Sequence, residues 1–220
     1  MNRNRIEEFS AYLDREVANA VKELGQLPEQ SRKHLQKLVY TNLVDRFDSM
    51  VDHILLENCR HKTLLDESLQ KLKDPLPEGE ILRLLIDTQG FDSHLDETLR
   101  ETLRNGVLRN RHSRKLNRLL EVFAPKEKLR SPRVNPSTGK ILGSYTQHNK
   151  SIPSSIPGYA DWLYSRRNAV VHGGGSSNML QNDLKQIKDI YNCDVGKSVK
   201  LKLGSITTAS TFYKSVVSLL

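Results

Sequence analysis

Arg167, Asn168 and His172 are the side chains in this sequence whose types and spacing best suit chemistry on a phosphate. The planar guanidinium of an arginine stays charged at neutral pH and can donate paired hydrogen bonds to phosphate oxygens. An imidazole titrates near neutrality, so it can accept or release a proton during a reaction. Arg167 is therefore predicted to hold a phosphate and His172 to act as acid or base, while Asn168 orients His172 or bonds the phosphate.

A predicted helix places these three side chains near its exposed C-terminal end. The helix is predicted from an apolar stripe at Tyr159, Trp162, Leu163 and Val170. Gly173, the first of three glycines, favours a helix end, which puts His172 in the last turn, where the helix dipole favours the imidazolium form. Arg167 and His172 are five residues apart, so an ideal helix points them in different directions. Both can serve one phosphate only if the helix end relaxes, or if a second copy of the helix supplies part of the site.

This order of residues resembles the motif of the HEPN superfamily (higher eukaryotes and prokaryotes nucleotide-binding domains). The family motif is an arginine and a histidine separated by four to six residues, commonly with a polar residue straight after the arginine. Arg167 matches the family's arginine, Asn168 the polar residue and His172 the histidine, with glycine following. The resemblance extends from the motif to the general helical pattern, and the middle third of the chain contributes nothing to it.

The resemblance implies a mostly α fold, an antiparallel helical bundle, that acts as a metal-independent RNA endonuclease and homodimer. In that reaction the RNA 2′-hydroxyl attacks the adjacent phosphorus, while Arg167 holds the phosphate and His172 moves protons. A toxin or anti-phage role is also implied, with an antitoxin or a larger defence complex as a further partner and no cofactor. The alternative is a catalytically silent HEPN-like module that binds RNA or protein, because a basic helix C-terminus also simply complements the helix dipole.

Four further residues are predicted to contact RNA: Arg166, Tyr164, Lys150 and Arg133. Arg166 offers a second phosphate contact or a plain surface charge, and Tyr164 offers a ring on which a base can stack. Lys150 and Arg133 belong to a long loop, residues 124–158, that leads into the motif helix as a lid or an RNA-contacting arm. Because this loop is rich in proline and polar residues, we expect it to be disordered in the free protein.

No metal site is predicted. His53, Cys59 and His61 are the only metal-like cluster, but their spacings do not converge on one ion and a fourth ligand is missing. Cys59 and Cys193, the only cysteines, are too few for a disulfide framework.

The composition indicates one globular, cytoplasmic domain spanning residues 1–220, with 37% hydrophobic and 27% charged residues. No apolar run approaches membrane-spanning length, so no membrane partner is expected. The net charge is +8, and residues 131–220, with 11 Lys and Arg against 4 Asp and Glu, carry +7 of it. This excess favours nucleic acid as a partner. A second basic run, Arg100–Arg118, leaves a helical DNA-binding protein, or a solvated basic helix face, as further alternatives.

Apolar periodicity predicts helices over most of the chain. They are expected near residues 6–25, 28–58, 62–73, 80–88 (ending at Gly90), 92–103 (capped by Asp92), 107–123, 159–172 and 179–191, and after Thr208. Val199–Leu203 alternates with period two, which predicts a small β element near the C-terminus whose pairing strand the sequence does not identify.

Overall fold

The computed structural model describes residues 3–71, 77–86, 88–148, 150–172 and 178–220. Within these ranges the chain is mostly helical, which confirms the predicted mostly α class. The glycine run that was expected to end the motif helix lies outside the described residues.

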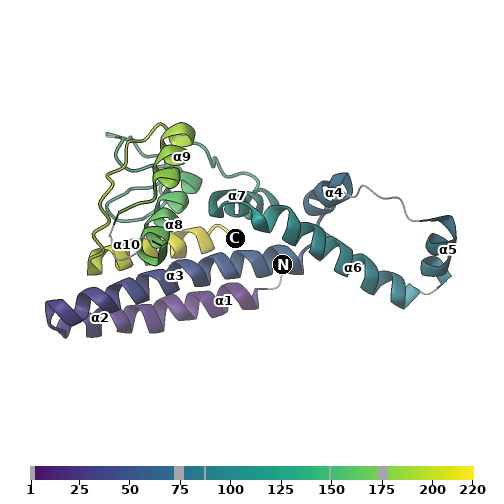
Figure 1. The fold of residues 1–220 in the computed structure, drawn as a ribbon, viewed down its shortest axis with the longest axis horizontal. Coiled ribbons are helices and arrows are strands. Elements are labelled where there is room, and N and C mark those ends of the chain that lie inside the picture. The colour runs from purple at the N-terminus through teal and green to yellow at the C-terminus, as the bar shows by residue number, and fades with distance from the viewer. Residues whose placement is uncertain (1–2, 72–76, 87, 149, 173–177) are drawn as a thin grey trace.

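The N-terminal part forms a long helical hairpin. α1 (Asn4–Ala11), the π-helical stretch η1 (Tyr12–Val17) and α2 (Ala18–Gln26) continue as one helix, close to the predicted bounds. α3 (Glu29–Glu57) follows Pro28 and runs back antiparallel to them (Figure 1). The buried residues of α3 recur every three or four positions from Tyr40 to Leu55, so one stripe of the helix faces the core.

α10 (Leu203–Val217) closes this hairpin from the other end of the chain. The ring of Tyr213 stacks on Phe47 of α3 with 4.1 Å between centroids, and the ring of Phe9 of α1 lies 5.6 Å from that of Phe47. Phe47 and Tyr213 are fully buried. The two ends of the chain therefore share one apolar core.

The middle third of the chain extends from one end of this core, to which its residues Leu64, Leu99 and Leu103 still contribute. α4 (Lys62–Lys71), α5 (Glu78–Ile86) and α6 (Thr88–Asn105) extend to one side of the molecule (Figure 1). The predicted helix end at Gly90 and cap at Asp92 are wrong, because α6 begins at Thr88 and includes both residues. One glycine costs a helix only about 1 kcal/mol, which the flanking residues can outweigh.

The helix predicted over residues 107–123 is divided in two. A short 3₁₀ turn, η2 (Val107–Arg109), precedes α7 (His112–Phe123). Asn110 and Arg111 have extended ψ angles of 171° and 152°, which interrupt the helix between them. α7 packs against both α3 and the motif helix.

The long loop is a packed part of the fold, contrary to the expected disorder. Val134 is fully buried, and the amides of Arg133 and Val134 both donate to the Ser154 carbonyl at 2.8 Å. Gly139 has φ +76° and lies so close to α10 that a Cβ would collide with the Thr208 carbonyl oxygen. These contacts join segments distant in sequence, so local periodicity carries no sign of them.

The motif helix α8 (Ile156–His172) follows this loop, and α9 (Gln181–Tyr191) packs beside it. The predicted β element at Val199–Leu203 is wrong. In the described chain this region forms only one antiparallel bridge, between Asn178 and Ser198, and α10 already begins at Leu203. Val199 is buried in a small apolar cluster with Ala169 of α8 and Ile187 of α9, and not by strand pairing.

Candidate active site at the C-terminal end of α8

α8 is anchored by its first half and exposed at its end. Tyr159, Ala160 and Leu163 are buried, and the Tyr40 hydroxyl of α3 donates to the Leu163 carbonyl at 3.0 Å. Val171 and His172, in the last described turn, are exposed. The motif therefore lies where the helix leaves the core.

Arg167 lies against α3 and is oriented by Asp45. Its Nε is 2.7 Å from Asp45 Oδ1, and its Nη2 donates to Asp45 Oδ2 at 3.0 Å. Only 19% of the Arg167 side chain is exposed, so Arg167 is more buried than its predicted place near the exposed helix end indicated. The carboxylate faces two nitrogens of the guanidinium fork, an arrangement that fixes the direction of the side chain.

Asn168 points toward α9 instead. Its Nδ2 donates to Asp183 Oδ2 at 3.3 Å, and its Oδ1 accepts from Arg167 Nη1 at 3.3 Å. Burial raises the pKa of Asp183, although the hydrogen bond from Asn168 opposes that shift. Asn168 thus connects the arginine on one side of α8 with a carboxyl group on the other.

His172 occupies the last turn of α8, as predicted. It follows Asn168 by four residues and lies on the same side of the helix. The structure brings Arg167 and Asn168 together, whereas no hydrogen bond joins His172 to either of them within the described residues. The five-residue step therefore separates the arginine from the histidine on a single helix, as the sequence indicated.

Arg166 and Tyr164 both make contacts within the protein. Arg166 Nη2 donates to the Lys200 carbonyl at 3.0 Å, and its guanidinium lies 4.6 Å from the centre of the Trp162 ring. The Tyr164 ring stacks on His112 at 5.1 Å with 6° between the planes, so one face is already covered. Contact with RNA would have to use the exposed remainder of these half-buried side chains.

Lys150 and Arg133 lie in the loop and not on the motif helix. Arg133 pairs with Glu127, and its Nε donates to the Leu142 carbonyl at 2.8 Å, which leaves 15% of the side chain exposed. Lys150 is exposed, and its carbonyl accepts from the Asp194 amide at 2.8 Å, just beyond α9. Of the two, Lys150 is the one with an accessible charge.

The sequence prediction missed a stripe of acids on α3 that faces the motif helix and α7. Asp45, Asp48 and Asp52 are spaced by three and four residues, which places them on one side of the helix. That spacing is visible in the sequence. The sequence does not indicate that basic residues of α7, which are buried, and Arg167 lie opposite these acids.

Asp48 is the centre of the buried part of this stripe. The Nζ of Lys115 lies 2.5 Å from Asp48 Oδ2 and 2.8 Å from Asp52 Oδ1, and His112 Nδ1 lies 2.7 Å from Asp48 Oδ1. Burial alone would raise the pKa of Asp48, but His112 and Lys115 outweigh it and hold that pKa below its ordinary value. Burial raises the pKa of Asp52. Since His112 and Lys115 are almost fully buried, this cluster positions helices and does not meet a substrate.

The basic run Arg100–Arg118 does not form a continuous free charged face. Arg100 lies 4.0 Å from Asp96, Arg118 lies 2.9 Å from Glu121, and Lys115 is buried in the cluster around Asp48. Arg111 also lies near Asp161, so four of the seven basic residues of this run pair with acids of the same protein, which lowers the support for the DNA-binding alternative.

Within the described residues, no three or more His, Cys, Asp or Glu side chains converge as metal ligands would. Cys59, of the cluster considered from sequence, is buried, and His53 Nδ1 lies 2.7 Å from the carbonyl of Ser49.

Comparison with protein-family models, with curated proteins and with solved structures yields no match to this chain. None of the helices, as far as the chain is described, combines the length and apolar character needed to span a bilayer.

Proposed function

We propose that this protein is a HEPN-like, metal-independent RNA endonuclease whose active site is built on Arg167, Asn168 and His172. The observation that carries the proposal is the arrangement at the end of α8. An oriented arginine and amide lie one helical turn before an exposed histidine. A fixed cation and an accessible proton donor and acceptor near the same helix end are the groups that cleavage of a phosphodiester requires.

In the proposed reaction the RNA 2′-oxygen forms a bond to the adjacent phosphorus, and the bond from phosphorus to the 5′-oxygen breaks. The products are a 2′,3′-cyclic phosphate and a 5′-hydroxyl end. Arg167 stabilises the extra negative charge on the phosphoryl oxygens, since a guanidinium remains charged throughout. His172 takes the proton from the 2′-hydroxyl or gives one to the leaving 5′-oxygen.

Asp45 has a defined part in this proposal. It holds two nitrogens of Arg167, so the fork is oriented before substrate arrives. The Arg167 side chain is 19% exposed, and this exposed part is where an RNA phosphate would approach the guanidinium. Such an enzyme would act in the cytoplasm as a toxin or anti-phage effector, the roles that the resemblance implies.

A catalytically silent module that binds RNA or protein is the second candidate. The pairing of Arg167 with Asp45 favours it, because a half-buried ion pair between α8 and α3 also explains the arginine as a purely structural contact. In that case His172 would be a solvated base at a helix end.

One assay separates the two candidates. The purified protein is incubated with total RNA and, separately, with duplex DNA, with and without EDTA. We expect cleavage of RNA alone, undiminished by EDTA, with products that carry cyclic phosphate ends. His172→Ala and Arg167→Ala should each reduce the rate by at least about 100-fold, the usual contribution of a general acid or base.

His148→Ala is a suitable control, because it removes an imidazole from the long loop and leaves the motif intact. Its rate should match that of the unaltered protein. Binding of RNA without cleavage, or cleavage that survives His172→Ala, would favour the silent module.

A further inference from the structure

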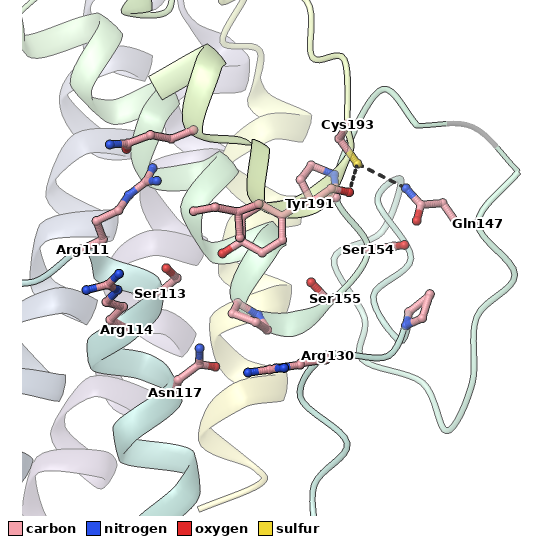
Figure 2. A pocket seen from close by; sticks show the side chains of 15 residues that line it. Arg111, Ser113, Arg114, Asn117, Arg130, Gln147, Ser154, Ser155, Tyr191 and Cys193 are labelled. Atoms are coloured by element: carbon pink, nitrogen blue, oxygen red, sulfur yellow. Dashed lines mark hydrogen bonds between the residues drawn. The ribbon is translucent and has the colours of Figure 1, made fainter. Parts of the chain in front are cut away.

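A second feature of the molecule is a cavity of about 670 Å³ at the opposite end of α8 from the motif. Figure 2 shows the side chains of Arg111, Arg114 and Asn117 on one side, with Ser154 and Gln147 from the loop on the other. Arg130 also lines it. A volume of this size is ordinary for a site that binds a small molecule.

The charge of the cavity wall is strongly positive. Three arginines line it and no Asp or Glu does. Arg111 lies 3.8 Å from Asp161, a buried carboxylate behind the wall that also accepts from the Tyr191 hydroxyl at 2.9 Å. Arg114 donates to the uncharged Asn110 side chain at 3.2 Å, and the Arg130 side chain has no hydrogen bond or ion pair to any described residue. Two of the three guanidinium charges are thus unneutralised.

Several polar atoms around the cavity are buried and lack a partner among the described residues. They are Ser154 Oγ, Asn117 Oδ1 and Arg111 Nη1. Ser154 is only 2% exposed. A buried polar group without a hydrogen bond is unfavourable, so three around one cavity indicate groups arranged for a ligand.

The N-terminal end of α8 lies at the same wall. Ser155 and Pro157 line the cavity, and the amide of Gly158 donates to Ser155 Oγ at 3.2 Å. A Cβ on Gly158 would lie 2.7 Å from Pro153 and from Ser155 Oγ, so only glycine allows the loop this close to the helix start. The N-terminal end of a 17-residue helix carries a partial positive charge that favours anions.

We infer that this cavity binds the phosphate group of a phosphate monoester. The arginines and the hydroxyl and amide groups match the several acceptor oxygens of such a group. One phosphate leaves most of the volume free, and Pro153, Ile190 and Tyr191 offer apolar surface to an organic remainder. The ester can be a small metabolite or the 5′-phosphate end of a nucleic acid strand. The inference does not rest on the proposed cleavage activity, because Ser155 and Arg167 are separated by about 18 Å along α8.

Calorimetric titration with inorganic phosphate and with pyrophosphate tests the site. We expect binding of one anion per chain, weakened at least about tenfold in the double variant Arg114→Gln/Arg130→Gln, because each charge-assisted hydrogen bond contributes measurably. Both arginines are exposed, so the variant should fold normally. The control is Arg104→Gln/Arg109→Gln, which removes two exposed charges outside the cavity and should leave affinity within about twofold.

Ser154→Ala gives an independent measurement. It deletes a buried hydroxyl without a partner, so the free protein should be at least as stable as the unaltered one while its phosphate affinity falls. Three results would each overturn the inference. The phosphate affinity could be unchanged in both Ser154→Ala and Arg114→Gln/Arg130→Gln, the control Arg104→Gln/Arg109→Gln could weaken binding equally, or the protein could bind no anion at millimolar concentration.

The source of the phosphate is resolved by competition. A 5′-phosphorylated deoxytetranucleotide, which has no 2′-hydroxyl to be attacked, is compared with the same strand ending in a 5′-hydroxyl. Displacement of pyrophosphate by the first strand alone assigns the site to a nucleic acid end. Displacement of pyrophosphate by neither strand assigns the site to a small phosphate ester. Each of these two results supports the site itself.

Discussion

His172 and Arg167 differ in how much of the fold depends on them. His172 is exposed at the helix end, whereas Arg167 is half-buried and paired with Asp45. Truncation of a side chain is costly where it leaves a buried charge without its partner and cheap where solvent replaces it. The two residues should therefore share a catalytic effect and differ in their effect on stability.

We predict that His172→Ala leaves the melting temperature unchanged, while Arg167→Ala lowers the free energy of unfolding by about 1 kcal/mol. A double-mutant cycle with Asp45→Ala, measured by urea unfolding, should give a coupling energy of similar size, because the two side chains contact each other directly. A coupling energy of zero would mean that Asp45 does not hold Arg167 in solution.

Asp48 is predicted to make stability depend on pH in the acidic range. Its pKa is below the ordinary value in the folded protein, so its stabilising effect is fully present above about pH 4 and is lost as the pH falls through the folded pKa. Asp48→Asn should cost about 3 kcal/mol at pH 7, because Lys115 stays buried with one carboxylate fewer. The difference between the two proteins, from urea unfolding at several pH values, should shrink toward pH 2. A constant difference would contradict the assignment.

At the scale of the element, the loop before α8 depends on one glycine. Gly139 has φ +76°, and its Cα faces the α10 backbone at Thr208. Gly139→Ala adds a Cβ where both the backbone angle and the space oppose it, so we expect a loss of about 2 kcal/mol in unfolding free energy. The measurement is chemical denaturation.

Gly143→Ala is the matched control within the same loop, since a Cβ there meets nothing within 4 Å. It should change the stability by less than about 0.5 kcal/mol. Equal effects of the two substitutions would show that the loop does not pack on α10 as described.

α8 is the element that gives the molecule its two candidate sites. Its N-terminal end lies at the wall of the arginine-lined cavity, and its last turns carry Arg167, Asn168 and His172. The positive end of the helix dipole lies at the cavity, and the negative end lies at His172. One helix therefore supplies opposite electrostatic environments to the two candidate sites.

At the scale of the whole molecule, we predict a two-fold homodimer in which the motif ends of two α8 helices meet. Arg167 faces α3 while His172 lies on the side of Asn168, so one helix does not bring them together. A two-fold axis near the helix end would place each histidine beside the arginine of its neighbour. Val171, 48% exposed in the same turn, would be buried by such a contact.

Mixing Arg167→Ala chains with His172→Ala chains tests this arrangement. If each site takes one residue from each chain, random mixing restores one site in half of the dimers, so about one quarter of the original activity returns. A mixture as inactive as its parents would contradict shared sites. A protein that sediments as a monomer at assay concentration, with a rate linear in protein, would contradict the dimer itself.

Much of the helical architecture could be predicted from local patterns. The first helix, α3, α7 and α10 have strong apolar periodicity, and proline or glycine marks several of their ends. The motif was likewise visible, because its chemistry depends on residue types a few positions apart on one helix. These features depend on residues a few positions apart in the chain, and a sequence pattern contains that local information.

The partners of those residues depended on tertiary structure. Asp45, which orients Arg167, is 122 positions away from it in the sequence. Lys115 is buried beside Asp48 and Asp52, which are 67 and 63 positions away. The arginine-lined cavity lies between residues of α7, the loop and α9. Val199, in the period-two pattern, is buried by packing against helical residues. Electrostatic pairing and burial act between groups close in space, whatever their separation along the chain, so only the folded chain decides which charges are neutralised and which stay free.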